Sequence, residues 1–163
     1  MGNMLTAAWA IVTSWHTNSS DVVFGAVRSG RTAPVNSVES IVGPTITTIP
    51  LRTRVDPYEL TGDFLRRVQR QAIATMPYEH FGLQHISRVS PDCQLACSFQ
   101  TLFAVQEGVG DLRTEEVPNA TKLGKATMLP GYALENYALT LEVFPMDWGF
   151  GVRAWFDSRS MDD

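Results

Sequence analysis

The segment GPTITTIPLRTR, residues Gly43–Arg54, decides the fold class of this chain. Threonine and isoleucine alternate from Thr45 onward, which is typical of a strand with one buried face. Pro50 follows the alternation, and proline cannot donate to a strand ladder, so we expect this strand at the edge of a sheet or at a bulge. Arg52 and Arg54 close the segment. It therefore predicts an edge strand with a basic end.

Helical patterns lie on both sides of this strand. After Asn3, a residue type that caps helices, apolar residues recur at spacings of three and four as far as Trp15 and predict a first helix. A stronger apolar stripe predicts a second helix over Pro57–Ala74. Shorter helical turns are expected within residues 37–44 and 76–87. The chain thus combines helices with at least one strand.

Four further strands are predicted from β-branched and aromatic content: VVFGAV (22–27), ACSFQTLFAVQ (96–106), YALTLEVFP (137–145) and GFGVRAWFD (149–157). A turn is expected around SPDC (90–93). The polar stretch Glu107–Lys125 is expected to be a surface crossover. Strands and helices in this order predict an α/β fold, a two-layer sandwich with a mixed β-sheet.

Composition and charge exclude several classes of protein. The chain has 163 residues, 44% of them hydrophobic, and a net charge of −4, which fits one compact acidic unit and no nucleic-acid footprint. The apolar run AAWAIV is far shorter than the roughly 20 residues of a membrane span, so no membrane association is expected. Two cysteines and no signal-peptide pattern favour a reducing, cytoplasmic setting.

Motifs of self-sufficient catalytic sites are missing. The sequence has no glycine-rich phosphate loop, no HExxH and no GxSxG. His80, His85, Cys93 and Cys97 could be drawn as a metal cluster, but their spacing is irregular, so no metal site is predicted. Cys97 is expected to be a small buried residue of a strand rather than a nucleophile. His16 follows a helix end, where a cation is favourable.

The order of several motifs resembles the condensation domains of nonribosomal peptide synthetases, fungal ones in particular. The resemblance is to the C-terminal half of such a domain and covers nearly the whole chain. It rests on five stretches: AAWAIVTSWHTNSSDVVFGAVRSGR (7–31), VESIVGPTITTIPLR (38–52), FLRRVQRQAIATMPYEHFGLQHI (64–86), CSFQTLFAVQ (97–106) and LTLEVFPMDWGFGVRAWFDSR (139–159). We therefore expect residues 1–163 to be a single partial domain, the C-terminal lobe of a condensation domain.

The resemblance implies a chloramphenicol-acetyltransferase-like lobe, one of two that form a V-shaped domain. The family forms amide bonds between acyl and aminoacyl thioesters, each tethered to a phosphopantetheine arm of a carrier protein. Its catalytic HHxxxDG motif belongs to the N-terminal lobe and is absent here. We expect no catalytic residue in this chain, no directly bound cofactor, and activity only with an N-terminal lobe and peptidyl or acyl carrier domains as partners, so its own status as an enzyme is open.

The same resemblance assigns supporting roles to individual residues. Arg31, next to Gly30, matches an arginine that pairs with the HHxxxDG aspartate of the other lobe. Thr47 stands where the family commonly has asparagine, and Arg52 closes that motif as support at a strand end. Tyr78 and Glu79 match a bracing PFE-type motif. Gln100 is a candidate for the tunnel wall, as the strand alternation places it with Leu102 and Ala104 and opposite Phe99 and Phe103.

Other functions stay open at this point. The chain could be a non-catalytic lobe that binds carrier proteins or serves as a scaffold, or a truncated gene product. A small independent acyltransferase that trimerises is a more distant alternative. In each case a sheet that normally meets another lobe would expose apolar surface and edge strands, which predicts marginal stability or self-association.

Overall fold

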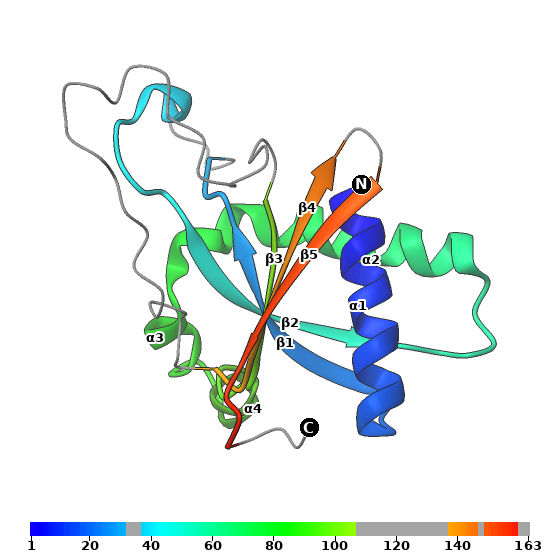
Figure 1. Ribbon diagram of the computed structural model, residues 1–163. Helices are drawn as coiled ribbons and strands as arrows, with labels where there is room; N and C mark the ends of the chain where they lie inside the picture. The colour runs from blue at the N-terminus through cyan, green and yellow to red at the C-terminus, as the bar shows by residue number, and fades with distance from the viewer. Residues whose placement is uncertain (32–36, 107–136, 147–148, 160–163) are drawn as a thin grey trace.

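The computed structural model describes residues 1–31, 37–106, 137–146 and 149–159 (Figure 1). These residues form a five-stranded sheet in the order β2-β1-β3-β4-β5. The central pairs β1–β3 and β3–β4 are parallel, whereas β1–β2 and β4–β5 are antiparallel. The predicted mixed sheet is confirmed. Its strands are β1 Asp21–Arg28, β2 Thr47–Arg54, β3 Thr101–Val105, β4 Leu139–Met146 and β5 Gly149–Phe156.

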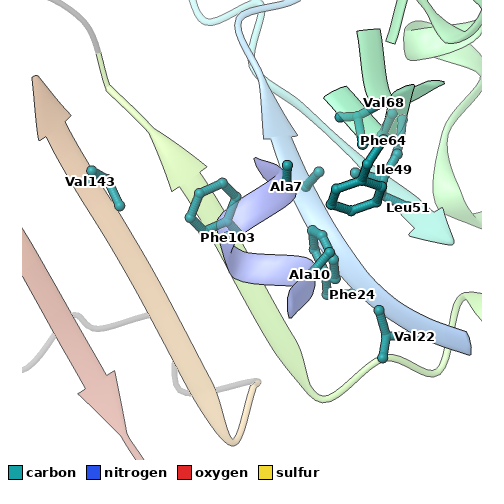
Figure 2. Close-up of a cluster of buried hydrophobic side chains, with 11 residues drawn as sticks. Ala7, Ala10, Val22, Phe24, Ile49, Leu51, Phe64, Val68, Phe103 and Val143 are labelled. Atoms are coloured by element: carbon teal, nitrogen blue, oxygen red, sulfur yellow. The ribbon is translucent and has the colours of Figure 1, made fainter. Parts of the chain in front are cut away.

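Two long helices, α1 (Gly2–Thr17) and α2 (Thr61–Thr75), cover one face of the sheet. Ala7 and Ala10 of α1 lie among the rings and branched side chains of the core in Figure 2. Their small side chains let the helix approach the strands closely. Phe103 of β3 stacks on Trp9 at 6.0 Å between ring centroids and meets Phe24 edge to face at 6.2 Å. These contacts hold the helical layer over the middle of the sheet.

The opposite face is covered in part by an aromatic residue that precedes β3. Strand alternation sends Phe24 toward the helices and Gly25 to the other side. A Cβ atom at Gly25 would lie 2.2 Å from the Phe99 ring, so the ring sits directly against the backbone of β1. Phe99 also stacks on Tyr137 at 5.3 Å. This contact supports the parallel ladder between β1 and β3, which contains only the pairs Gly25–Leu102 and Ala26–Phe103.

Strand β2 is an edge strand whose outer side is blocked. The Val55 N–H donates to the Ser20 carbonyl, which fixes the register so that the even-numbered residues of β2 point their backbone groups away from β1. Pro50 is one of them, and it has no N–H to leave unpaired. Side chains of α2 bind two outward carbonyls: Gln71 Nε2 donates to Arg52 at 2.7 Å and Arg67 to Arg54 at 2.6 Å. The predicted edge position of this strand is confirmed.

The remaining segments differ from the sequence prediction mainly before β3. Residues 91–96, predicted as the end of a turn and the start of a strand, form helix α4 (Pro91–Ala96), and Cys97 caps it. The predicted strand over residues 96–106 was therefore too long at its start. The reason is a local capping signal, because the Ser90 hydroxyl accepts the Cys93 N–H and Pro91 occupies the first helical position.

The predicted short helical turns are present as 3₁₀ helices η1 (Val38–Ser40) and η2 (Met76–Phe81) and as helix α3 (Leu83–Ile86). The second long helix begins four residues later than predicted, since the Asp56 side chain accepts the Tyr58 N–H and forms a turn first. The predicted crossover Glu107–Lys125 lies outside the described residues. Within those residues, no helix is long and apolar enough to span a membrane.

Candidate functional site

The predicted support residues Gly30, Arg31 and Glu79 meet where β1 ends. Gly30 follows the strand with φ of +67°, a backbone conformation that favours glycine. It is buried, and a Cβ atom there would lie 1.8 Å from the Thr45 carbonyl oxygen. The Thr45 hydroxyl in turn donates to the Ser29 carbonyl at 2.7 Å. The two segments that flank the strand ends are thus pressed together, and only glycine fits at this position.

Helix η2 packs its acidic and imidazole side chains against the same turn. His80 Nε2 lies 2.8 Å from the Gly30 carbonyl oxygen, so this ring nitrogen carries the proton and donates. Glu79 is buried, and its Oε1 lies 3.8 Å from Arg28 Nε, an ion pair between η2 and the last residue of β1. Tyr78, by contrast, is 69% exposed. Of the predicted bracing pair, the structure therefore brings Glu79 to the site, together with His80.

The electrostatics of the Arg28 guanidinium reflect its partial burial. Burial lowers the pKa of Arg28 below its ordinary value, while the Glu79 carboxylate opposes that shift. An arginine pKa starts so high that the group stays cationic at neutral pH. Arg28 Nε is buried without a hydrogen-bond partner among the described residues, so the charge interaction with Glu79 is its main compensation. This pair fixes η2 on the strand.

Arg31 lies on the solvent side of the turn and binds backbone rather than carboxylate. Its guanidinium donates to the carbonyls of Val38 at 3.1 Å, Ile41 at 3.3 Å and Gly43 at 3.4 Å. The residue is exposed, and its guanidinium is in no ion pair with a carboxylate among the side chains that the structure describes. Arginine forms planar, bidentate pairs with carboxylates when one is within reach. The structure therefore holds an oriented cation at the surface.

Thr47 and Arg52 lie at opposite ends of β2. Thr47 is opposite Arg28 in the ladder and so belongs to the same region, and its buried hydroxyl has no hydrogen-bond partner among the described residues. Arg52 makes a two-pronged pair with Asp21, with Nε to Oδ1 at 2.9 Å and Nη2 to Oδ2 at 2.6 Å. This pair lowers the pKa of the Asp21 carboxyl, chiefly through the hydrogen bond from Arg52. Arg52 is thus distant from the β1 turn.

A shallow groove of about 680 Å³ lies beside the Arg52–Asp21 pair. It runs between the outer edge of β2 and helix α2, and Ala74 and Gln71 form part of its wall. Two of its guanidinium groups are bound to carboxylates, Arg52 to Asp21 and Arg67 to Glu59. The groove is therefore basic but partly neutralised. Its lining residues are Asp21, Arg52, Arg54, Arg67, Arg70, Gln71 and Ala74.

Gln100 lies apart from the β1 turn. It precedes β3, is exposed, and donates from Nε2 to the Ser98 carbonyl at 3.2 Å. Because the strand begins only at Thr101, alternation does not fix which face Gln100 occupies. The face predicted for Phe99 was wrong for the same reason, since its ring packs on Gly25 and not beside Phe103.

The histidines and cysteines do not assemble into a metal centre within the part of the chain that the structure describes. Cys93 and Cys97 are both free thiols, and burial raises the pKa of the Cys97 thiol, which disfavours a nucleophilic thiolate. The His85 ring contacts Phe81, and the His16 ring contacts Trp15. The role of His80 was missed from sequence, because its partner Gly30 is 50 residues away along the chain.

The comparisons with known proteins identify this architecture. The sequence model of the family described as Condensation domain matches residues 1–160. This chain belongs to the condensation domain family. It is similar to AM-toxin synthetase AMT1 of Alternaria alternata, with 49% identity over 162 residues, 99% of this chain and 4% of the relative. It is also similar to nonribosomal peptide synthetase SIDD of Beauveria bassiana, with 42% identity, 99% of this chain and 9% of the relative.

Solved structures agree with the condensation-domain fold. A crystal structure of a CT mutant gives a TM-score of 0.68 at 20% identity and covers 99% of this chain and 37% of that one. The first condensation domain of the CDA synthetase gives a TM-score of 0.64 at 15% identity, and the match covers 98% of this chain and 34% of that structure. The predicted chloramphenicol-acetyltransferase-like lobe with a mixed sheet is confirmed. The chain spans about a third of these structures and a small part of its curated relatives.

Proposed function

We propose that residues 1–163 are the C-terminal lobe of a nonribosomal peptide synthetase condensation domain, which supports amide bond formation when an HHxxxDG-bearing lobe faces it. The observation that carries this proposal is Arg31. Its exposed guanidinium is oriented by three backbone carbonyls, and no carboxylate pairs with it among the side chains that the structure describes. An aspartate on a second lobe could form a charge-assisted hydrogen bond with the Arg31 guanidinium.

The chemistry explains why a second lobe is needed. The amine nitrogen of a carrier-bound aminoacyl group attacks the carbonyl carbon of a carrier-bound acyl thioester. The new C–N bond forms, the C–S bond breaks, the nitrogen loses a proton, and the donor carrier's thiol gains one. A group near the attacking nitrogen must position it and accept a hydrogen bond. This sequence lacks HHxxxDG. The phosphopantetheine arms belong to the partner carrier domains.

The remaining predicted residues have supporting roles in this proposal. Gly30 and Glu79 hold the turn that carries Arg31, with Glu79 acting through Arg28. Thr47 lies opposite Arg28 in the β1–β2 ladder, and we assign it a packing role at that end of β2. Arg52 secures the far end of β2 through Asp21. Tyr78 and Gln100 are exposed and are available to contact the other lobe and the tunnel, respectively. We place the assembled synthetase in the cytoplasm, in secondary metabolism.

A reconstitution experiment tests the proposal. The chain is fused behind the N-terminal lobe of a fungal relative, and amide product on the carrier domain is measured by mass spectrometry. We expect turnover by the fused domain and none by the 163-residue chain. The Arg31→Ala variant should lower turnover by about tenfold or more, the scale of a lost charge-assisted contact. Arg66→Ala is the control, because Arg66 is exposed and its ion pair among the described residues is with Asp63 of its own helix.

Turnover by the lone chain would contradict the proposal, and so would full activity of the Arg31→Ala fusion. A second candidate function is a non-catalytic lobe that binds carrier domains. It is favoured by the placement of the histidines, since His80 is committed to the Gly30 carbonyl and the rings of His16 and His85 contact neighbours in their own segments. Carrier binding by a fused domain that gives no amide product would support this alternative.

A further inference from the structure

The groove between β2 and α2 has backbone hydrogen-bond donors along its strand side. The register of β2 turns the N–H groups of Arg52 and Arg54 outward, on the side where the groove lies. The carbonyls of the same two residues accept hydrogen bonds from the side chains of Gln71 and Arg67. Within the part of the chain that the structure describes, no group accepts from either N–H. This edge therefore has two free donors, whereas the matching acceptors are occupied.

The side chains of the groove add to this excess of donors. Its lining contains four arginines and one aspartate, and thus a formal charge of +3, in a chain whose net charge is −4. Arg52 and Arg67 are each held in place by a two-pronged contact with a carboxylate. Arg54 and Arg70 are exposed and form no ion pair with the carboxylates of the described residues. The groove thus combines two fixed guanidinium groups with two that are free to turn toward a ligand.

We propose that this groove binds a diphosphate group, either as the free anion or as part of a nucleotide. A ligand that fits must bring negative charge and acceptors. The oxygens of an ionised phosphate accept hydrogen bonds, and they form charge-assisted, bidentate contacts with arginine. A peptide strand added to this edge would also bring N–H donors, and these would meet carbonyls that Gln71 and Arg67 already occupy. The pattern of free groups therefore favours an oxyanion over a strand.

The spacing of the backbone donors favours two linked phosphates over one. The outward N–H groups of Arg52 and Arg54 are two residues apart along the strand, which corresponds to about 7 Å. The oxygens of a single phosphate lie too close together to accept from both donors at good angles, and hydrogen bonds weaken steeply when they are bent. Two linked phosphates present oxygens over a longer span. The free side chains of Arg54 and Arg70 are then available for the remaining oxygens.

The site does not depend on the proposed condensation function. All the contacts that build it lie within residues 21–71, which the structure describes, and Arg52 lies at the opposite end of β2 from the turn that carries Arg31. Loss of diphosphate binding should therefore leave amide bond formation by the fused domain unchanged, so the two proposals fail independently.

Calorimetric titration with inorganic pyrophosphate tests the site, at low ionic strength because salt screens exposed charges. We expect saturable binding of one pyrophosphate per chain, and orthophosphate should bind at least about tenfold more weakly, since it loses one of the two backbone contacts. Arg54→Ala and Arg70→Ala should each weaken pyrophosphate binding by about tenfold, the scale of a lost charge-assisted contact. Arg66→Ala is the matched control, because Arg66 is an exposed arginine of the same helix that does not line the groove. Thermal melts check that each variant folds.

Three further titrations complete the test. ADP is compared with pyrophosphate: tighter binding of ADP identifies a nucleotide as the source of the diphosphate, and tighter binding of pyrophosphate identifies the free anion. Citrate carries similar charge on carboxylates, and equal affinity for citrate overturns the assignment to diphosphate. Unchanged affinity in both Arg54→Ala and Arg70→Ala overturns the site. Pyrophosphate is also titrated into the fused two-lobe domain, and loss of binding there would show that the other lobe covers the groove, which overturns the proposal for the assembled domain.

Discussion

His80 of η2 donates from Nε2 to the carbonyl oxygen of Gly30 at 2.8 Å, and so joins a helix at the end of α2 to the turn that follows β1. Glu79 and Arg28 form an ion pair beside this bond. The two contacts fix the position from which Arg31 extends. In the proposed function, the position of the Arg31 guanidinium thus depends on His80, Glu79 and Arg28, which support the turn and do not bind substrate.

Loss of the His80 bond should cost stability. We expect His80→Ala to lower the free energy of unfolding by about 1 kcal/mol, the typical net value of one hydrogen bond, with an added penalty if the carbonyl stays unsatisfied. Urea denaturation measures the change. His16→Ala should have little effect, because His16 is exposed and its ring contact within the described part of the chain is with the neighbouring Trp15. Equal effects of the two substitutions would contradict the bracing role of His80.

Replacement of Gly30 should be more damaging. The Cβ of Gly30→Ala would lie 1.8 Å from a backbone oxygen, and the positive φ adds strain of about 1–2 kcal/mol for a residue with a side chain. We expect a total loss of about 2 kcal/mol or more in thermal or urea unfolding. Gly62→Ala is a control of opposite sign, since Gly62 lies in helix α2, a Cβ atom there would make only an ordinary contact at 4.0 Å with the Arg66 side chain, and alanine favours helices. A neutral Gly30→Ala would show that the turn can relax.

The Asp21–Arg52 pair predicts a stability change on the acid side. The pKa of Asp21 is lowered from 3.8 in the folded chain, so the pair stabilises the fold above that value, and this stabilisation is lost as the pH falls through the lower, folded pKa. Asp21→Asn should reduce the slope of unfolding free energy against pH below about pH 4. Because the Arg52 side chain is 68% exposed and that of Asp21 39%, the effect should be small and weaken in high salt. Arg52→Ala should remove the same pH-dependent stabilisation. An unchanged slope of unfolding free energy against pH in both variants would contradict this prediction.

Glu142 is expected to change the pH dependence of stability in the opposite direction from Asp21. Burial raises the pKa of Glu142, against a smaller lowering effect of Arg153. A carboxyl with a raised pKa favours the folded state most when protonated, so its contribution is present at low pH and is lost as the pH rises through the folded pKa. Glu142→Gln should therefore raise stability at pH 7 relative to the wild type, with the difference vanishing near pH 3. A constant difference across that range would contradict this prediction.

Phe103 should be a major determinant of stability. Its ring contacts both Trp9 and Phe24, so Phe103→Ala should cost about 3–5 kcal/mol, the usual range for a buried phenylalanine, and shift the emission of Trp9. Phe150→Ala in the same sheet removes a ring that is about half exposed and should cost far less in the monomer. Comparable losses would show that β5 is covered in solution.

Local patterns predicted most of the fold. Pro50 indicated an edge strand because its missing N–H is a backbone property that any sheet must accommodate, and the structure confirms this position. The long helices followed from their apolar periodicity. The predicted start of the strand at residue 96 was wrong because residues 96–100 have strand-like composition, whereas the helix that begins after the Ser90 cap with Pro91 extends to Ala96 and β3 begins only at Thr101. A capping signal outweighed strand propensity.

The candidate site was less accessible from sequence. Family resemblance selected Gly30, Arg31 and Glu79, which the structure places near one another. It did not select His80 or Arg28, because their roles arise from contacts between segments about 50 residues apart. No local pattern encodes such a contact. The position of Phe99 over Gly25 was unpredictable for a similar reason, since it required the strand boundary to be known first.

The short ladder between β1 and β3 has a mechanical consequence. Two residue pairs join the antiparallel pair β1–β2 to the β3–β4–β5 half, whereas the two antiparallel ladders at the sides extend over eight residues each. The Phe99 ring on Gly25 and the Phe103 ring against Phe24 clamp this seam from both faces. The sheet therefore has two parts, each with a long antiparallel ladder, that are joined by a short parallel ladder. A force that a neighbouring domain applies to one part should act first on the bonds at Gly25 and Ala26.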